Sequence, residues 1–257
     1  MAQSIRVSLE ERILTITLDR ADKRNALTHE MYTGLAEALE RAENDPEVRV
    51  VILRAEGGLF TAGNDLADFA DLADDDRPSE QWPVTRFLHA LIRCGVPVVA
   101  AVQGRAVGVG TTMLLHCDLV VLGEDASLTV PFVDLALVPE ACSSLLLPQR
   151  IGHARAFAMF ALGEPMGAQE ALAAGIATSA VPPEQIHDEA RRLAEQLLAR
   201  PARSLAETKA LMRDVPALLE HTRREIEVFA ARLRSPEAAE ALAAFTQKRR
   251  PDFAQFE

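Results

Sequence analysis

The 257-residue sequence has few cysteines, no long uninterrupted apolar segment and no recognisable secretion signal. Its three cysteines, Cys94, Cys117 and Cys142, are odd in number and form no CxxC pair, which argues against a disulfide or zinc framework. No apolar run reaches the ~20 residues of a membrane-spanning helix. The N-terminus, MAQSIRVSLEER, lacks a basic region followed by an apolar one. We therefore expect a soluble, cytoplasmic protein that does not enter membranes.

The sequence also contains fewer basic than acidic residues. The chain carries 27 Lys and Arg against 38 Asp and Glu, a net charge of −11. A surface of this sign disfavours non-specific binding to nucleic acid or to anionic lipid. We expect no nucleic-acid partner, although a local basic patch could still bind an anion.

Several catalytic motifs are missing as well. GVGTTM (108–113) lacks the last glycine of GxGxxG, and the sequence contains no GxxxxGK[ST], GxSxG or HExxH. The six histidines are scattered, and we interpret His116, beside Cys117, as helix-end packing. Cys142 is expected to pack in the interior, because nothing nearby in the sequence would make it a thiolate. We predict neither a metal site nor a separate cofactor.

The first half of the chain alternates strand and helix patterns. Residues 5–9 and 13–18 have period-two apolar spacing and predict a hairpin, and an amphipathic helix should follow Thr28. Buried strands are predicted around 48–55 and 96–102, and shorter ones at 119–123 and 126–130. Strands separated by helices indicate an α/β core with parallel pairing. The acidic segment 67–80 is predicted to be a solvated loop.

After about residue 150 the sequence consists of Ala-rich amphipathic segments separated by prolines. We divide the chain into a core at residues 1–195 and a helical C-terminal region at 196–257. The apolar faces of such helices are often buried against another subunit.

Two glycine-rich stretches, LFTAGNDL (59–66) and GRAVGVGTT (104–112), each follow a predicted buried strand. Glycine lets the backbone approach a ligand, and the first turn of a helix has N–H groups without intrahelical partners. Two such turns side by side would present two N–H groups to one oxygen atom, as an oxyanion hole does. Spacing alone favours the simpler interpretation, two ordinary tight turns.

Four motifs make the pattern more specific. RADKRNALT (20–28), FTAGNDL (60–66), residues 98–121 and PFVDLALVPEACSS (131–144) resemble, in order and spacing, the crotonase (enoyl-CoA hydratase/isomerase) superfamily. The resemblance extends from about residue 5 to the C-terminal region. It implies an α/β fold, a crotonase-like spiral of ββα units with a helical C-terminal trimerisation region. It also implies an acyl-CoA thioester substrate and a homotrimer or a hexamer built from two trimers.

The resemblance also implies the site residues. The backbone amides of Asn64 and Val109 would hold the thioester oxygen as an enolate. Positions implied to contact the acyl-CoA are Lys23, Arg24, Ala26, Ala62, Gly63, Asp65, Leu66, Gly108, Gly110, Phe132 and Lys248. Solvated surface charge is the alternative for the basic residues, and capping of the following helix is the alternative for Asp65.

The acid and base residues distinguish the branches of this superfamily. Family hydratases use two glutamates, and those positions are occupied here by Thr112 and Phe132, which cannot transfer a proton near neutral pH. The chain has instead Glu140 in PEACSS, which resembles the PEGCSS-like stretch of peroxisomal-type Δ3,Δ2-enoyl-CoA isomerases, with Ala141 in place of glycine. The resemblance therefore implies an isomerase of fatty-acid degradation with one glutamate as its acid and base.

Glu140 lies in an otherwise uncharged run of ten residues, and a buried carboxylate is costly unless it has a partner or a task. A single carboxylate in a dry pocket can move a proton from C2 to C4 of an enoyl thioester. The alternative for Glu140 is an acid at a helix N-terminus. Rival functions are a hydratase or another crotonase-type reaction using Asp134 or Asp68, and an RNA-binding relative, which the net charge disfavours.

Overall fold

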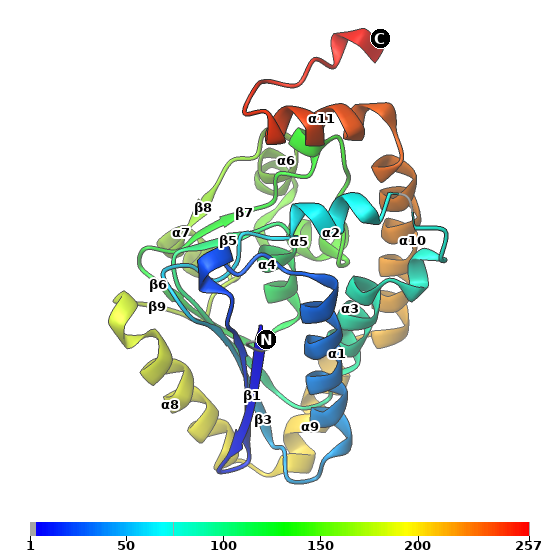
Figure 1. Cartoon of the computed structure of the whole chain (residues 1–257). Helices are drawn as coiled ribbons and strands as arrows, with labels where there is room; N and C mark the ends of the chain where they lie inside the picture. The colour runs from blue at the N-terminus through cyan, green and yellow to red at the C-terminus, as the bar shows by residue number, and fades with distance from the viewer. Residues whose placement is uncertain (1–3, 74, 257) are drawn as a thin grey trace.

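Two β-sheets form the centre of the computed structural model, which describes residues 4–73 and 75–256, Ala70 by its backbone alone (Figure 1). The larger sheet has the strand order β1-β2-β3-β4-β6-β9, and the smaller has β5-β7-β8. The strands of the larger sheet are β1 (Ile5–Glu10), β2 (Ile13–Leu18), β3 (Val50–Ala55), β4 (Val98–Val102), β6 (Leu119–Gly123) and β9 (Ser179–Val181). The strands of the smaller sheet are β5 (Arg105–Val107), β7 (Ser127–Thr129) and β8 (Met166–Gly167).

Pairing in the larger sheet is mainly parallel, as the alternation of strands and helices predicts. β1 and β2 form the predicted antiparallel hairpin. Its turn residues, Glu11 and Arg12, both have positive φ, the conformation of the two-residue turns that match strand twist. From β2 to β9 each neighbouring pair is parallel. The carboxyl ends of β3 and β4 therefore reach the same edge of the sheet, and the two glycine-rich turns follow there.

Helices cover both faces of the larger sheet. Their bounds are α1 (His29–Asn44), α2 (Leu66–Asp71), α3 (Pro83–Arg93), α4 (Val109–Thr112), α5 (Ser143–Ile151), α6 (His153–Leu162), α7 (Ala168–Ala173), α8 (Ile186–Leu198), α9 (Ala202–Met212), α10 (Val215–Leu233) and α11 (Pro236–Thr246). The predicted helix after Thr28 is confirmed, and the Thr28 hydroxyl caps it by accepting the Met31 N–H.

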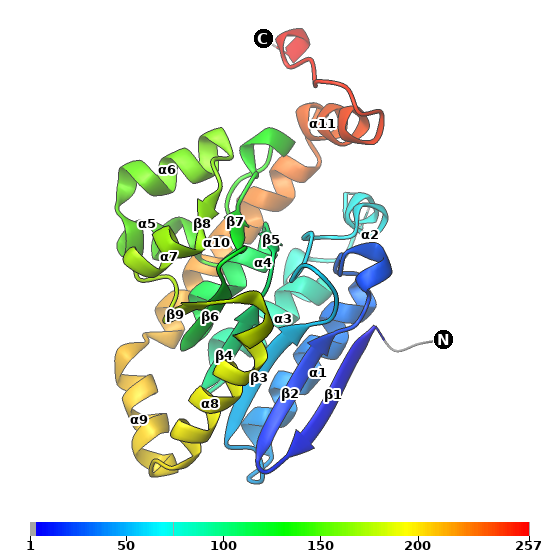
Figure 2. The ribbon, with the colours of Figure 1, turned by 90° about the vertical axis from the view of Figure 1, so that its left-hand side faces the viewer.

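The two faces of the sheet have separate cores because successive strand residues point in opposite directions. On β3, Val51 and Leu53 belong to the main core with α1, whereas Val50 and Ile52 pack with Ile186 of α8. Figure 2 shows α8 on one side of the sheet and α1 on the other. This double burial explains why β3 and β4 are almost entirely apolar.

The prediction of a loop throughout 67–80 is wrong in its first part, because residues 66–71 form α2. Asp65 caps this helix: its Oδ1 accepts the Ala67 N–H at 3.1 Å. Phe69 and Leu72 are buried, and Phe69 meets Phe229 of α10 edge to face at 6.0 Å. The burial of Phe69 and Leu72 therefore stabilises a helix here, although the segment has an acidic composition. Asp74 lies outside the described residues.

The C-terminal helices α9, α10 and α11 follow α8, and residue 195, where the sequence division falls, lies inside α8. α10 is tied to the main core through Phe229, Ala230 and Leu233. Among the described residues no helix combines the length and apolar character that crossing a bilayer requires.

Candidate active site

The two glycine-rich turns lie side by side. Thr61 and Ala106 form a parallel bridge, in which the Thr61 N–H donates to the Arg105 carbonyl at 3.2 Å. The Val107 N–H in turn donates to the Thr61 carbonyl at 3.1 Å. Segments that follow β3 and β4 thus continue together beyond the sheet. The structure shows that the two turns are neighbours, a relationship that their spacing in the sequence did not favour.

Glycine is required where these turns approach each other. Gly63 has φ +90°, and a Cβ there would lie 3.0 Å from the Val107 carbonyl oxygen. A Cβ on Gly110 would lie 2.3 Å from Cγ2 of Thr61, closer than real Cβ atoms come to a neighbour. The absence of side chains at these two positions therefore allows the turns to pack against each other.

Backbone direction indicates where the Asn64 amide points. The Leu27 N–H donates to the Gly63 carbonyl, and the Leu27 carbonyl accepts the Asp65 N–H. Because both of these hydrogen bonds point toward Leu27, the N–H of the intervening Asn64 points away from it. Val109 is the first residue of α4, where N–H groups have no intrahelical acceptor. Within residues 4–73 and 75–256, neither the Asn64 nor the Val109 amide has a hydrogen-bond acceptor. Both amides are available for an external oxygen atom.

Glu140 lies against the end of α4. The Thr112 hydroxyl donates to Oε1 of Glu140 at 2.6 Å, and Thr112 is one turn beyond Val109. Glu140 is only 8% exposed. Burial raises its pKa to about 8, and the Thr112 hydrogen bond opposes that rise. The structure thus brings Glu140 and the Val109 turn together.

Tyr32 connects α1 to the same site. Its hydroxyl donates to the side-chain carbonyl of Asn64. The ring is buried and contacts Phe87 at a centroid distance of 5.7 Å. Burial, and secondarily the negative charge of Glu140, raise the pKa of Tyr32 well above its ordinary value. Tyr32 is therefore a neutral donor close to both Asn64 and Glu140.

The chain turns sharply just after Glu140. Ala141 and Cys142 both adopt the left-handed conformation, with φ of 58° and 57°. His116 Nε2 bonds to the Ala141 carbonyl at 2.7 Å, and burial lowers the pKa of His116 to about 3, so the ring is neutral. His116 therefore acts in packing, as predicted, and supports the segment that carries Glu140.

The interpretation of Glu140 as an acid in the first turn of a helix is wrong. Helix α5 begins only at Ser143, and Cys142 is its N-terminal flanking residue. The carboxylate of Glu140 bonds to Thr112, not to amides of α5. The left-handed pair at residues 141 and 142 separates the carboxylate from the helix.

The three cysteines are free and buried. Burial raises the pKa of Cys117 and Cys142 to about 12, which keeps both as thiols. The packing interpretation of Cys142 is confirmed. Among the described residues no group of three or more His, Cys, Asp or Glu side chains is arranged to hold a metal ion.

The residues implied to contact the acyl-CoA have varied surroundings. Lys23 and Arg24 are exposed, and the Arg24 carbonyl accepts the Ala62 N–H at 3.0 Å, which places their turn beside the first glycine-rich turn. Ala26 and Ala62 are half-buried. Gly108 is the residue before α4 and has φ +56°.

Asp65 has two observed partners. Its Oδ2 accepts a hydrogen bond from Arg20 at 2.7 Å, and this contact holds the pKa of Asp65 below its ordinary value. Its other oxygen caps α2, so the capping role considered for this residue is present. Leu66, the next residue, is 41% exposed.

Among the described residues, neither Phe132 nor Lys248 forms a hydrogen bond or an ion pair with Glu140. Phe132 is buried and packs on Phe160 with ring centroids 6.2 Å apart. Lys248 is exposed after α11 and has positive φ. Their implied contacts with acyl-CoA remain predictions.

The two rival acids are engaged elsewhere. Asp68 accepts the His29 N–H at 2.6 Å and so helps to begin α1. Asp134 is exposed, and its carboxylate lies against Gly163. Neither of these two carboxylates forms a described contact with Glu140 or with the glycine-rich turns.

Sequence reasoning missed two buried polar residues near Glu140, Tyr32 and Glu225. Tyr32 is the only tyrosine in the chain, and it follows Met31 on the buried side of α1. Glu225 lies on the buried face of α10 with Thr222 and Phe229, at helical spacing. A charged residue at an apolar position of an amphipathic helix is the signal that could have revealed Glu225.

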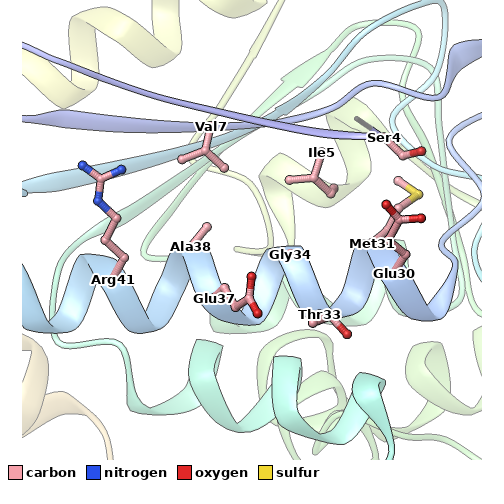
Figure 3. A pocket seen from close by; sticks show the side chains of 10 residues that line it. All are labelled: Ser4, Ile5, Val7, Glu30, Met31, Thr33, Gly34, Glu37, Ala38 and Arg41. Carbon is pink, nitrogen blue, oxygen red and sulfur yellow. The ribbon is translucent and has the colours of Figure 1, made fainter. Parts of the chain in front are cut away.

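A hollow of about 550 Å³ lies elsewhere, between β1 and α1 (Figure 3). Ile5 and Met31 contribute apolar surface, and Glu37 and Arg41 lie along α1 beside it. Met31 faces this hollow, whereas the next residue, Tyr32, reaches Asn64. The hollow contains none of the residues predicted to form the site, and we do not associate it with catalysis.

Comparison with known proteins gives a consistent result. The family model described as enoyl-CoA hydratase/isomerase matches residues 8–256. An enoyl-CoA hydratase/isomerase structure from Pseudoalteromonas atlantica T6c superposes with a TM-score of 0.91 and is 42% identical, covering 97% of this chain and 99% of that chain.

Curated relatives carry different names. The 1,2-epoxyphenylacetyl-CoA isomerase of Escherichia coli is 32% identical over 98% of this chain and 99% of the relative. The 2,3-dehydroadipyl-CoA hydratase of the same species is 32% identical over 96% and 97%. Enoyl-CoA delta isomerase 2 of Rattus norvegicus is 31% identical over 96% of this chain and 64% of its own length.

The architecture is therefore the α/β crotonase fold, with two sheets and C-terminal helices, as the sequence resemblance implies. The chain belongs to the enoyl-CoA hydratase/isomerase family. The curated relatives named above have nearly the same percentage of sequence identity to this chain, but they are named for different reactions. The particular reaction must therefore be argued from the residues of the site.

Proposed function

We propose that this protein is a Δ3,Δ2-enoyl-CoA isomerase that uses Glu140 as its single acid and base, in fatty-acid degradation. The observation that carries the proposal is the buried Glu140 carboxylate, bonded to Thr112 and adjacent to the turn of Val109. Of the three acids considered, Glu140, Asp68 and Asp134, only Glu140 has a side chain in contact with the helix turn that begins at Val109.

In the first step, the thioester oxygen accepts hydrogen bonds from the Asn64 and Val109 amides. Both amides lack a described protein acceptor, so an oxygen placed there gains two donors without displacing other hydrogen bonds. The donors stabilise negative charge as it develops on that oxygen. One donor of this kind is typically worth about 10²–10³ in rate.

Glu140 then transfers the proton. The carboxylate removes a proton from C2 of a 3-enoyl-CoA, and the electron pair of the C–H bond delocalises into a dienolate held by the two amides. The protonated Glu140 returns the same proton to C4, and the double bond becomes conjugated between C2 and C3. Burial strengthens Glu140 as a base because it raises the pKa of the carboxyl.

A hydratase mechanism has less support from these residues. Water addition in the family requires two glutamates, and Thr112 and Phe132 stand at those positions. Asp68 is bound to the start of α1, and Asp134 is exposed beside Gly163. The resemblance to enoyl-CoA delta isomerase 2 of Rattus norvegicus is consistent with one-acid chemistry, although a named hydratase is equally similar.

The CoA moiety would bind beside the first glycine-rich turn. Lys23 and Arg24 are exposed there and next to Ala62, so they can meet phosphate groups despite the net charge of −11. We propose that Lys248 contributes a further cation from the C-terminal region. Ala26, Asp65 and Leu66 would border the pantetheine and adenine.

We also propose that the protein assembles as a trimer or hexamer through the region 196–257. Support comes from large apolar side chains that are exposed in the single chain, including Leu211 at 90% and Met212 at 79% at the end of α9. Light scattering after gel filtration would measure the assembly, and a monomer at micromolar concentration would contradict it.

The activity test uses purified protein with a 3-enoyl-CoA and follows the appearance of the conjugated 2-enoyl-CoA by absorbance. Glu140→Gln should abolish the conversion, because an amide cannot accept the C2 proton. A Glu140→Gln variant with wild-type rate would contradict the assignment. Rapid hydration of a 2-enoyl-CoA by wild-type protein, lost on substitution of Asp68 or Asp134, would identify a hydratase instead.

A further inference from the structure

Glu225 is a second buried acid near Glu140, and the proposed reaction does not use it directly. It lies on α10 and is 7% exposed. No lysine or arginine among the described residues pairs with it. His221 Nε2 lies 3.4 Å from Oε1, but partial burial lowers the pKa of His221, so the ring is neutral near pH 7. A buried carboxyl without a cation costs several kcal/mol, so its position requires an explanation.

Its hydrogen bonds point to the beginning of α5. Oε1 of Glu225 accepts the Ser144 N–H at 2.9 Å and also the Ser144 hydroxyl. Glu225 thus acts as an N-terminal cap for α5, although it lies 81 residues further along the chain. The positive end of the α5 dipole favours the carboxylate there. Oε2 has no described partner.

The segment that Glu225 holds is the one that carries Glu140. The Ser143 N–H donates to the carbonyl of Glu140 at 3.0 Å, which links the acid to the first turn of α5. Between them, Ala141 and Cys142 are both left-handed, at a cost of about 1–2 kcal/mol for each residue. Such a pair persists only if neighbouring groups fix it.

Two groups from other parts of the chain hold the left-handed pair Ala141 and Cys142, which we call the elbow, and the residue that follows it. His116 bonds to the Ala141 carbonyl, and Glu225 bonds to Ser144. His116 is itself contacted by Arg213, whose Nη1 donates to the His116 carbonyl at 3.1 Å. Loss of either support would let the elbow relax and would move the Glu140 carboxylate relative to the substrate.

Charge couples the two acids as well. Burial is the main cause of the raised pKa of Glu140, and the negative charge of Glu225 raises it further. Burial also raises the pKa of Glu225 to about 7, so Glu225 is charged over most of the range in which Glu140, with a pKa of about 8, ionises. The other groups that face Glu140 are neutral: Thr112 from α4 and Tyr32 from α1. Glu225 is faced by His221 on its own helix, by Ser144 from α5 and by the Cys142 thiol, which is neutral because its pKa is about 12.

We propose that Glu225 is a positioning residue for Glu140: from α10 it fixes the first turn of α5 and the preceding elbow, and its negative charge acts on the Glu140 carboxyl. The proposal rests on the proposed role of Glu140 as the base. It assigns a function in the reaction to a residue of the C-terminal helices that the substrate need not touch.

Glu225→Gln tests the charge. Glutamine retains an acceptor for Ser144 but removes the negative charge, so Glu140 should ionise at lower pH, by about half a unit or more. The infrared band of the protonated Glu140 carboxyl, identified by its loss in Glu140→Gln, is titrated in wild type and in Glu225→Gln. This measurement needs no turnover.

Glu225→Ala tests the cap. It should lower kcat for the isomerisation about tenfold or more while KM changes about twofold or less, because substrate binding remains and the base is misplaced. The low-pH limb of kcat/KM should also move to lower pH in both variants. Glu227→Gln is the matched control, because it removes the same charge from an exposed position of the same helix. It should leave the titration and the rates as in wild type.

The outcomes separate this proposal from the proposed function. A Glu140 midpoint that moves in Glu225→Gln but not in Glu227→Gln supports it, even if the wild type proves not to isomerise 3-enoyl-CoA. An unmoved midpoint overturns the charge coupling. Wild-type kcat in Glu225→Ala overturns the positioning role, and if that variant does not fold, the titration of Glu225→Gln alone decides.

Discussion

The hydroxyl of Tyr32 donates a hydrogen bond to the side-chain carbonyl of Asn64, which fixes α1 to the turn whose amide we assign to the oxyanion hole. Tyr32→Phe keeps the ring against Phe87 but removes this bond. We expect kcat to fall about three- to tenfold, which corresponds to the loss of one net hydrogen bond, while KM changes little. Steady-state kinetics with a 3-enoyl-CoA measures both.

Thr33→Val is the control for this variant. Thr33 is next to Tyr32 on α1, and its hydroxyl donates to the His29 carbonyl. Its removal should leave kcat unchanged. Equal losses of kcat in the two variants would show that α1 is merely destabilised and that the contact with Asn64 has no special role.

The pH dependence of wild-type activity follows from the raised pKa of Glu140. In the proposed mechanism the active form of Glu140 is the carboxylate, so kcat/KM should rise with pH and level off above about 8. With an unperturbed glutamate, whose pKa is 4.5, the acidic limb of this pH profile would lie near pH 4.5. A profile that is flat between pH 6 and 9 would contradict a buried Glu140 as the base.

Thr112→Val should move this limb in the alkaline direction. Burial raises the pKa of Glu140, and the Thr112 hydroxyl opposes that effect by bonding to the carboxylate. Without the hydroxyl, the anion loses a donor and forms only at higher pH. Thr85→Val, which removes a buried hydroxyl bonded to the Ser79 carbonyl, should leave the limb in place. A limb at lower pH in Thr112→Val would refute this account.

Glu140→Gln should stabilise the fold, and the gain should increase with pH. The folded pKa, about 8, lies above the ordinary 4.5, so between these values the folded state holds a proton that the unfolded state has lost. Stability therefore falls as pH rises through this window in wild type. The increase in the free energy of unfolding that Glu140→Gln causes should be larger at pH 8 than at pH 5, by on the order of 3 kcal/mol.

Urea unfolding at the two pH values measures this difference. A matched substitution at an exposed acid, Glu227→Gln, should show no comparable pH dependence. A gain for Glu140→Gln that is the same at pH 5 and pH 8 would mean that Glu140 ionises normally in the folded protein.

Gly110→Ala should damage the site through packing alone. The added Cβ would lie 2.3 Å from Cγ2 of Thr61 and would force the two glycine-rich turns apart. We expect kcat to fall at least about tenfold and stability to fall by about 1–3 kcal/mol. Gly58→Ala is the control, because a Cβ there meets no atom within 4 Å. Activity and thermal melting measure both effects, and a Gly110→Ala variant with wild-type activity would contradict the close packing of the turns.

Much of the fold could be predicted from local pattern. The hairpin of residues 5–18 and the helix capped by Thr28 each have a periodicity that only one secondary structure satisfies. The short apolar runs of β3 and β4 are typical of strands that are buried on both faces. The prediction failed at 66–71, where composition suggests a loop. There Phe69 is buried against Phe229, a residue 160 positions away in sequence, and Asp65 caps the helix. Local composition cannot reveal such distant anchoring.

The sequence by itself determined the family and predicted which residue is the acid: the glycine-rich motifs and the PEACSS segment are short, contiguous and chemically restrictive. The tertiary structure alone decided what surrounds that acid. Thr112, Tyr32 and Glu225 come from three separate helices, and their relation to Glu140 depends on how those helices pack. The ionisation of a carboxyl is set by burial and by neighbours in space, and neither is encoded within a few residues of Glu140.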